Sequence, residues 1–170
     1  DTTESGYYLC CNRNKRSITC DIATPNGQAL IRELAAKADV FVENYKVGDM
    51  ARYGLDWDTL RTINPRLVYC SITGFGQTGP YKDRAGYDFA IQAMGGLMSV
   101  TGEPDGRPLK VGVALVDVMA GLHAAIGILA ALRHRERTGE GQVVEVDLLS
   151  TTLFALANQA SGYLTAGVVP

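Results

Sequence analysis

The sequence is poor in the residues that build metal centres and disulfide frameworks. It has four Cys and two His among 170 residues, and no pair of cysteines has the Cys-x-x-Cys spacing. A zinc site of the Cys/His type is therefore not expected, and no metal ligand is assigned. Cys10 and Cys11 are adjacent and poorly placed to pair with each other. We expect reduced thiols in a cytoplasmic protein.

A surplus of one charge is also lacking. Sixteen Lys and Arg residues oppose 18 Asp and Glu residues, which gives a formal net charge of -2. Nonspecific binding to nucleic acid needs a basic surplus that neutralises phosphates, so no nucleic-acid partner is expected. Long uncharged apolar runs are missing as well, because the most apolar stretch, 111–132, contains Asp117 and His123. We therefore expect no membrane partner.

The motifs of several common enzyme folds are absent. The sequence contains neither GxxxxGK[ST], which forms a P-loop, nor GxSxG, which forms the nucleophile elbow of α/β-hydrolases. The run GFGQTG at 74–79 matches GxGxxG and follows a predicted strand. However, Pro80 comes next and no apolar helix begins there, as a dinucleotide-binding motif requires. We interpret the run as a crossing from a strand into a loop.

Short apolar segments alternate with longer segments of helical periodicity. The apolar segments predict strands at 17–22, 40–42, 67–72 and 143–146. The periodic segments predict helices at 25–38, between Asp56 and Pro65, at 87–99, at 115–138 and at 148–165. Thr24 and Pro25 are suited to begin the first of these helices, and Gly139 to end the fourth. The alternation indicates βαβ units with a parallel sheet, an α/β fold.

Asp117 is the only carboxylate in a long apolar run. In the predicted helix 115–138 the large apolar residues form a stripe, and Asp117 lies on a different face with Gly121, Ala124 and Ile128. A carboxylate in the first helical turn can cap free N–H groups and complement the helix dipole. It can also serve as a nucleophile or base in apolar surroundings. Spacing alone leaves both interpretations open.

Six blocks of residues follow one another in a fixed order along the chain, and the match that they carry extends over essentially the whole chain. They are NRNKRSI at 12–18, DVFVENY at 39–45, NPRLVY at 64–69, SITGFG at 71–76, GYDF at 86–89 and TGEGQ at 138–142. On these blocks the sequence resembles the family III CoA-transferases, which include the formyl-CoA:oxalate and carnitine CoA-transferases. The resemblance implies a Rossmann-like parallel sheet flanked by helices, incomplete here, within a larger fold that forms intertwined homodimers.

The resemblance also implies how the chain relates to the whole enzyme. Residues 1–170 would be the central portion of a large CoA-binding α/β domain, with an N-terminal strand and the C-terminal part of the enzyme outside them. A glycine-rich loop that covers the active aspartate would lie beyond Pro170. The isolated fragment is accordingly expected to be inactive.

The function implied is transfer of CoA from a donor acyl-CoA to an acceptor carboxylic acid. An aspartate early in the long helix, four residues before a glycine, is the nucleophile of the family, and Asp117 with Gly121 fits that pattern. The carboxylate would form an aspartyl anhydride and then an aspartyl-CoA thioester. CoA thioester is then a substrate, and no permanently bound cofactor is expected. The sequence does not identify donor and acceptor, but GYDF at 86–89 and LLST at 148–151 most resemble members that use dicarboxylates such as succinyl-CoA.

Binding residues are carried over position by position. Asn44 and Tyr45 match an Asn-aromatic pair that contacts CoA, and Arg52 matches a basic residue suited to a CoA phosphate. Where some members have a lysine, this chain has Ala85, and Arg84 or Lys82 would substitute for it. Two further segments, one beside the nucleotide and one beside pantetheine and the nucleophile, contribute Cys20, Asp21, Ile22, Ala23, Tyr87 and Asp88.

Two other functions compete with CoA transfer. The α-methylacyl-CoA racemase branch of the superfamily uses a His/Asp pair for proton transfer, with His after the glycine at position 86. This chain has Tyr87 there, and a phenol with a pKa of about 10 is a poor base at neutral pH. The other alternative is a non-catalytic fragment that acts as an assembly module. Transfer is the function that the residue at position 87 favours.

Overall fold

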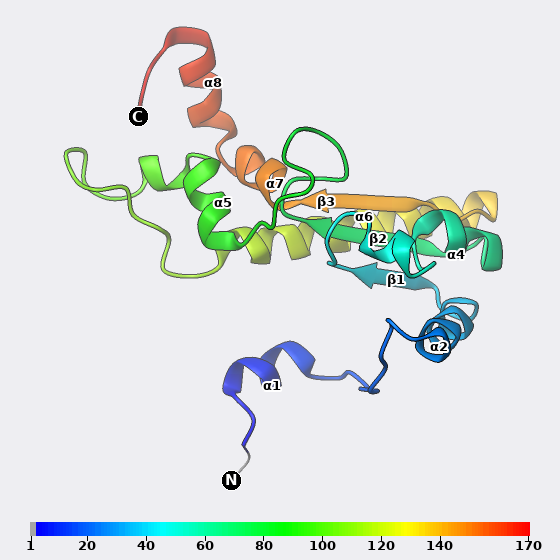
Figure 1. The fold of residues 1–170 in the computed structure, drawn as a ribbon. Coiled ribbons are helices and arrows are strands. Elements are labelled where there is room, and N and C mark those ends of the chain that lie inside the picture. Colours follow the sequence, from blue (N-terminus) through cyan, green and yellow to red (C-terminus); the bar gives the residue numbers. More distant parts are fainter. Residues whose placement is uncertain (1–2) are drawn as a thin grey trace.

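The computed structural model describes residues 3–170 and has a three-stranded parallel sheet at its centre (Figure 1). The strands are β1 (Val40–Glu43), β2 (Val68–Thr73) and β3 (Val143–Asp147), and they lie in the order β1-β2-β3. In the middle strand, Cys70 is paired with Val42 on one side and Val144 on the other. All three strands therefore end at the same edge of the sheet, and the α/β fold expected from the sequence is confirmed.

Helices cover both faces of this sheet. In Figure 1, α6 (Leu115–Thr138) runs behind the strands and α4 (Trp57–Ile63) lies in front of them. The other helices are α1 (Gly6–Asn12), α2 (Pro25–Ala35), α3 (Asp49–Arg52), α5 (Asp88–Met94), the 3-10 helix η1 (Leu97–Val100), α7 (Leu148–Ala155) and α8 (Ala157–Ala166). Two buried apolar clusters hold these layers together.

The first cluster joins α2 and α4 to the sheet. Leu60 and Leu67 are fully buried in it, and Tyr69 stacks its ring on Phe41 at 5.2 Å between centroids. The second cluster joins α5, α6 and α7 through Ile91 and its neighbours. Ile91 is fully buried as well. The second cluster is the one that supports the beginning of α6, where Asp117 lies.

Several sequence signals for helix ends are confirmed. The Thr24 side chain accepts a hydrogen bond of 3.1 Å from the Gly27 N–H, and Pro25 is the first residue of α2. Gly139 ends α6 in the left-handed conformation, with φ of 83°. Such a conformation is readily adopted by glycine because it has no Cβ.

One predicted element is wrong and two predicted helices are interrupted. The predicted strand at 17–22 forms no ladder with any strand of residues 3–170, because alternating side chains make a strand only where a neighbouring strand offers backbone partners. The predicted helix 87–99 ends at Met94, because Gly96 has φ of 88° and η1 follows. The predicted helix 148–165 is divided into α7 and α8 at Leu156. Helices α1 and α3 were not predicted.

The stripe of large apolar residues on α6 does not face the sheet. Val118, Leu122, Ile126 and Leu129 are between 59% and 65% exposed, whereas the buried residues of the helix are Val116 and three alanines. Small residues allow close packing: a Cβ on Gly127 would lie 2.6 Å from a methyl carbon of Val144. Helix α6 has two apolar faces, and the one with smaller residues packs on the sheet. Periodicity identifies apolar faces but does not say which of two is buried.

Helix α6 also satisfies the length and composition of a membrane-spanning helix, as core helices of soluble proteins can. In this structure it packs along β2 and β3. One face of α6 thus belongs to the α/β unit, and the other face is exposed.

Candidate functional site

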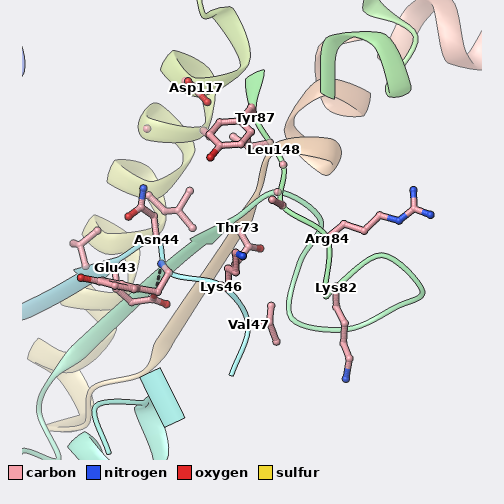
Figure 2. A pocket seen from close by; sticks show the side chains of 18 residues that line it. Glu43, Asn44, Lys46, Val47, Thr73, Lys82, Arg84, Tyr87, Asp117 and Leu148 are labelled. Atoms are coloured by element: carbon pink, nitrogen blue, oxygen red, sulfur yellow. Dashed lines mark hydrogen bonds between the residues drawn. The ribbon is translucent and has the colours of Figure 1, made fainter. Parts of the chain in front are cut away.

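A pocket of about 620 Å³ opens where β1 and β2 end and α6 begins (Figure 2). Parallel α/β sheets bind ligands at this edge, since the loops that follow the strands converge there. Asp117 and Tyr87 lie at one end of the pocket in Figure 2, and Glu43 and Asn44 lie at the other. The remaining lining residues are Val42, Tyr45, Lys46, Val47, Ile72, Thr73, Gly74, Lys82, Arg84, Ala85, Gly86, Ala120, Gly121 and Leu148.

Asp117 is in the first turn of α6 and is exposed to the pocket. Within residues 3–170 no hydrogen bond reaches its carboxylate, although its backbone N–H is bonded. Partial burial raises the pKa of this carboxyl above its ordinary value, and the negative charge of Asp88 raises it further. A carboxylate of raised pKa is a better nucleophile, and this one accepts no hydrogen bond from the residues that the structure describes.

The cap of α6 comes from another helix. Ala114, at the N-cap position, has no side chain that can accept a hydrogen bond. Instead, Oδ2 of Asp88 accepts hydrogen bonds from the N–H groups of Val116 and Asp117, at 2.8 and 3.2 Å. Asp117 therefore does not cap α6 through its side chain, because Asp88 accepts these hydrogen bonds, although the Asp117 charge still lies in the first turn, where it complements the helix dipole. The Asp117 side chain remains available for chemistry.

Beside Asp117 the surface of α6 is open. Gly121 follows one turn later on the same face, and a Cβ built on it would have no atom within 4 Å. Gly121 and Ala120 both line the pocket. The small face that the sequence indicated is present, and it leaves room for a group bound against the carboxylate.

The chain that leaves β1 is held by Glu43. This side chain is only 9% exposed, and its Oε2 accepts a hydrogen bond of 2.8 Å from the Tyr45 N–H. Burial, together with the Glu43 carboxylate, raises the pKa of the Tyr69 phenol. The hydrogen bond from the Tyr45 N–H to Glu43 fixes the turn that presents Asn44 and Tyr45 to the pocket. Glu43 was not predicted to be a site residue, since a carboxylate at a strand end carries no sequence signal of burial.

Two glycines bring the loop 82–87 against the end of β2. A Cβ on Gly74 would lie 2.5 Å from Cα of Gly86, and a Cβ on Gly86 would meet Cα of Gly74 at the same distance. Only glycine at both positions permits this approach. Gly76 and Gly79 have φ of 86° and 89°, so the GxGxxG-like run is a loop with left-handed residues, as interpreted from the sequence.

Three cations belong to the wall of the pocket. Lys46, Lys82 and Arg84 line it, and Figure 2 shows Lys82 and Arg84 extending away from Asp117. The Arg84 guanidinium carbon lies 4.2 Å from the centre of the Tyr81 ring, a cation–π contact. The positive charges of Lys46, Lys82 and Arg84 on this wall suit an anionic ligand. Lys46 was not singled out from the sequence, because an isolated surface lysine has no distinguishing pattern.

The structure brings together some of the site residues expected from the sequence and leaves others outside. Asn44, Tyr45, Arg84, Tyr87 and Asp117 line one pocket. Tyr87 is 76% exposed. Asp88 lies directly behind the pocket, where it caps α6.

Arg52 and the segment 20–23 do not line this pocket. Arg52 forms an ion pair of 3.2 Å with Asp49 and lies over the Tyr53 ring. The residues Cys20, Asp21, Ile22 and Ala23 form the turn before α2, where the Asp21 carbonyl accepts a hydrogen bond of 2.8 Å from the Thr24 hydroxyl. This turn is packed against Gly27, at which a Cβ would collide with the Asp21 backbone.

Comparison with known proteins assigns the chain to a family. The model of the family described as CoA-transferase family III matches residues 1–170. The chain belongs to CoA-transferase family III. The family resemblance noted in the sequence is thus confirmed.

Curated relatives and solved structures are similar over almost all of the chain. A succinate–glutarate CoA-transferase of Agrobacterium fabrum is 52% identical over 170 residues, which are 100% of this chain and 42% of that protein. A formyl-CoA:oxalate CoA-transferase of Streptomyces avermitilis is 49% identical over 150 residues, 88% of this chain and 36% of that protein. The crystal structure of a CAIB/BAIF family protein from Brucella suis superposes with a TM-score of 0.94 at 54% identity, covering 98% of this chain and 44% of that one. The chain thus spans less than half the length of these proteins.

Proposed function

We propose that the protein containing this chain transfers CoA from a donor acyl-CoA to an acceptor carboxylic acid, with Asp117 as the nucleophile. The observation that carries the proposal is the Asp117 carboxylate itself. It is exposed to the pocket, accepts no hydrogen bond within residues 3–170 and has a raised pKa. Membership of CoA-transferase family III supports the reaction class.

The Asp117 carboxylate would form anhydride and thioester intermediates in each turnover. Asp117 attacks the thioester carbonyl carbon of the donor, the C–S bond breaks, and CoA thiolate leaves an acyl-aspartyl anhydride. The thiolate then attacks the aspartyl carbonyl, which releases the donor acid and leaves an aspartyl-CoA thioester. The acceptor carboxylate attacks this thioester, and the thiolate finally takes the acceptor acyl group and frees Asp117. No atoms beyond those of the two substrates are needed.

The pocket supports binding of CoA and a small acid. Asn44 and Tyr45 are proposed to contact CoA, Arg84 a phosphate or carboxylate, and Tyr87 the pantetheine next to Asp117, because all of them line the same pocket. Asp88 would contribute indirectly through its contact with α6. Arg52 and the segment 20–23 are proposed to contact the nucleotide part of CoA, which would then extend past this pocket.

Dicarboxylates are the proposed substrates. The relative from Agrobacterium fabrum is a succinate–glutarate CoA-transferase and is 52% identical over this chain. Succinyl-CoA as donor and glutarate as acceptor are therefore the first pair to assay.

An intertwined homodimer in the cytoplasm is proposed from the family resemblance. The exposed apolar face of α6 offers a surface that further protein could cover.

Mass spectrometry of the complete natural protein tests the proposal. After mixing with succinyl-CoA, we expect a CoA adduct on the peptide that contains Asp117 and glutaryl-CoA once glutarate is added. The variant Asp117→Asn should give neither product. Absence of an adduct during wild-type turnover would reject the aspartyl mechanism. Deuterium exchange at the α-carbon of a 2-methylacyl-CoA without any acceptor would instead support the racemase function.

A further inference from the structure

A buried amide lies behind the proposed nucleophile. Gln92 of α5 is fully buried. Its Nε2 donates hydrogen bonds to Asp88 Oδ1 at 2.5 Å and to the Val113 carbonyl at 3.4 Å, and its Oε1 accepts one of 2.9 Å from the Val111 N–H. Two oxygens face its nitrogen and one N–H faces its oxygen, so only one orientation of the amide satisfies all three bonds.

The Gln92 amide is connected to the backbone before and after the start of α6. Directly, it binds the backbone of Val111 and Val113, which lead into the helix. Indirectly, it holds one oxygen of Asp88 while the other oxygen accepts the N–H groups of Val116 and Asp117. The first turn of a helix has N–H groups without intrahelical partners, so it depends on such contacts for its order.

The placement of a nucleophile is sensitive to small displacements. A shift of about 1 Å can slow a reaction by about 100-fold. Asp117 belongs to the turn that Asp88 caps, and the charge of Asp88 also acts on the Asp117 carboxyl. Rotation of the Asp88 carboxylate would therefore change both the position and the ionisation of Asp117.

We propose that Gln92 is a positioning residue for CoA transfer: it orients Asp88 and anchors residues 111–113, so that Asp117 faces the pocket in one fixed geometry. The inference rests on the proposed function of Asp117. Gln92 does not line the pocket, and its effect is transmitted by Asp88 and the backbone. It should change the rate of the chemical steps and leave CoA binding nearly intact.

The variant Gln92→Met removes all three hydrogen bonds at similar volume. Asn64 supplies a matched control, because its side chain also makes three bonds: it donates to the carbonyls of Ala35 and Ala38 and accepts from the Arg66 N–H. Asn64 ends α4 and precedes β2, so it lies at the opposite edge of the sheet from the pocket. Asn64→Leu therefore reports the loss of a half-buried amide with three hydrogen bonds, and we expect no effect on the start of α6.

Transfer from succinyl-CoA to glutarate is measured on the complete natural protein, below the Tm of every variant. For Gln92→Met we expect kcat to fall by about 10- to 100-fold, while KM for succinyl-CoA changes by less than about twofold. Asn64→Leu should lower the Tm but keep kcat. Equal kcat values in Gln92→Met and wild type, or equal losses in Gln92→Met and Asn64→Leu, would overturn the proposal.

An exchange of the two side chains gives an independent test, including the case in which Gln92→Met does not fold. In Asp88→Asn/Gln92→Glu, the new amide N–H can donate to the new carboxylate, which still accepts from Val111. The Asn oxygen can still accept from the start of α6, and only the weak bond to Val113 is lost. Asp88→Asn alone points one amide N–H group at another. We expect the double variant to recover at least about tenfold of the kcat lost in Asp88→Asn, and no recovery would count against the proposal.

Amide hydrogen exchange separates failure of this inference from failure of the proposed function. In Gln92→Met, exchange of the peptide that contains Val116 and Asp117 should accelerate, and in Asn64→Leu it should match wild type. Unchanged exchange in Gln92→Met would overturn the proposal that Gln92 orders the start of α6. If wild type transfers no CoA although exchange accelerates as expected, the proposed function fails. Gln92 then loses its role in the reaction and keeps only its contact with the helix.

Discussion

Gly121 provides a sharp test of the space beside Asp117, because stability and activity should respond in opposite directions. A glycine within a helix is less stable than alanine by about 0.8–1 kcal/mol, since it loses more backbone freedom on folding. A Cβ on Gly121 would have no atom within 4 Å, so Gly121→Ala introduces no clash in the free protein. The structure therefore predicts that this variant raises the free energy of unfolding.

The same methyl group should slow transfer. Gly121 lines the pocket one turn after Asp117, and the new Cβ would occupy the space proposed for the thioester. Overpacking of this kind costs about 1–3 kcal/mol, which corresponds to a loss of about 5- to 150-fold in kcat/KM. Gly162 in α8 is the matched control: it also lies inside a helix, and its Cβ would have no neighbour within 4 Å.

Thermal unfolding and steady-state transfer assays on the complete protein measure both effects. Gly121→Ala and Gly162→Ala should raise the Tm by similar amounts, and only Gly121→Ala should lose kcat/KM. If Gly121→Ala is as active as wild type, the thioester does not lie against this face of α6. If it is less stable than wild type, the space beside Gly121 is not open.

Three further predictions concern the pH profile, the loop and the core. Transfer needs ionised Asp117, whose pKa is raised, so kcat/KM should fall with decreasing pH at a value above the ordinary Asp pKa of about 3.9. Asp88→Asn removes the neighbouring charge and should move this acid limb to lower pH, and an unmoved limb would exclude the electrostatic coupling. Gly86→Ala forces a methyl group against the Gly74 backbone, so we expect a loss of about 1–3 kcal/mol in urea unfolding and a higher KM for acyl-CoA. Leu60→Ala in the buried core should cost about 2–5 kcal/mol with KM unchanged below the Tm, and a shifted KM would contradict the separation of core and pocket.

Local signals in the sequence were sufficient for most of the fold. Thr24 and Gly139 bound helices because hydroxyl caps and left-handed glycines act within a few residues. The prediction at 17–22 failed because a strand is a pairing between segments, and alternation in one segment cannot supply the partner. The large apolar stripe of α6 is visible in the sequence, but its burial is not, since Leu122 is 59% exposed. Periodicity cannot choose between two apolar faces.

The sequence by itself determined the α/β class, the small face around Asp117 and Gly121, and the family resemblance, because each depends on residue type and spacing along one segment. Only the tertiary structure decided what Asp117 is free to do. The cap of α6 is supplied by Asp88 from a different helix, and Asp88 is oriented by Gln92. These contacts join α5 to the start of α6 across a loop, and hydrogen bonds between such segments depend on their placement in space rather than on any local pattern.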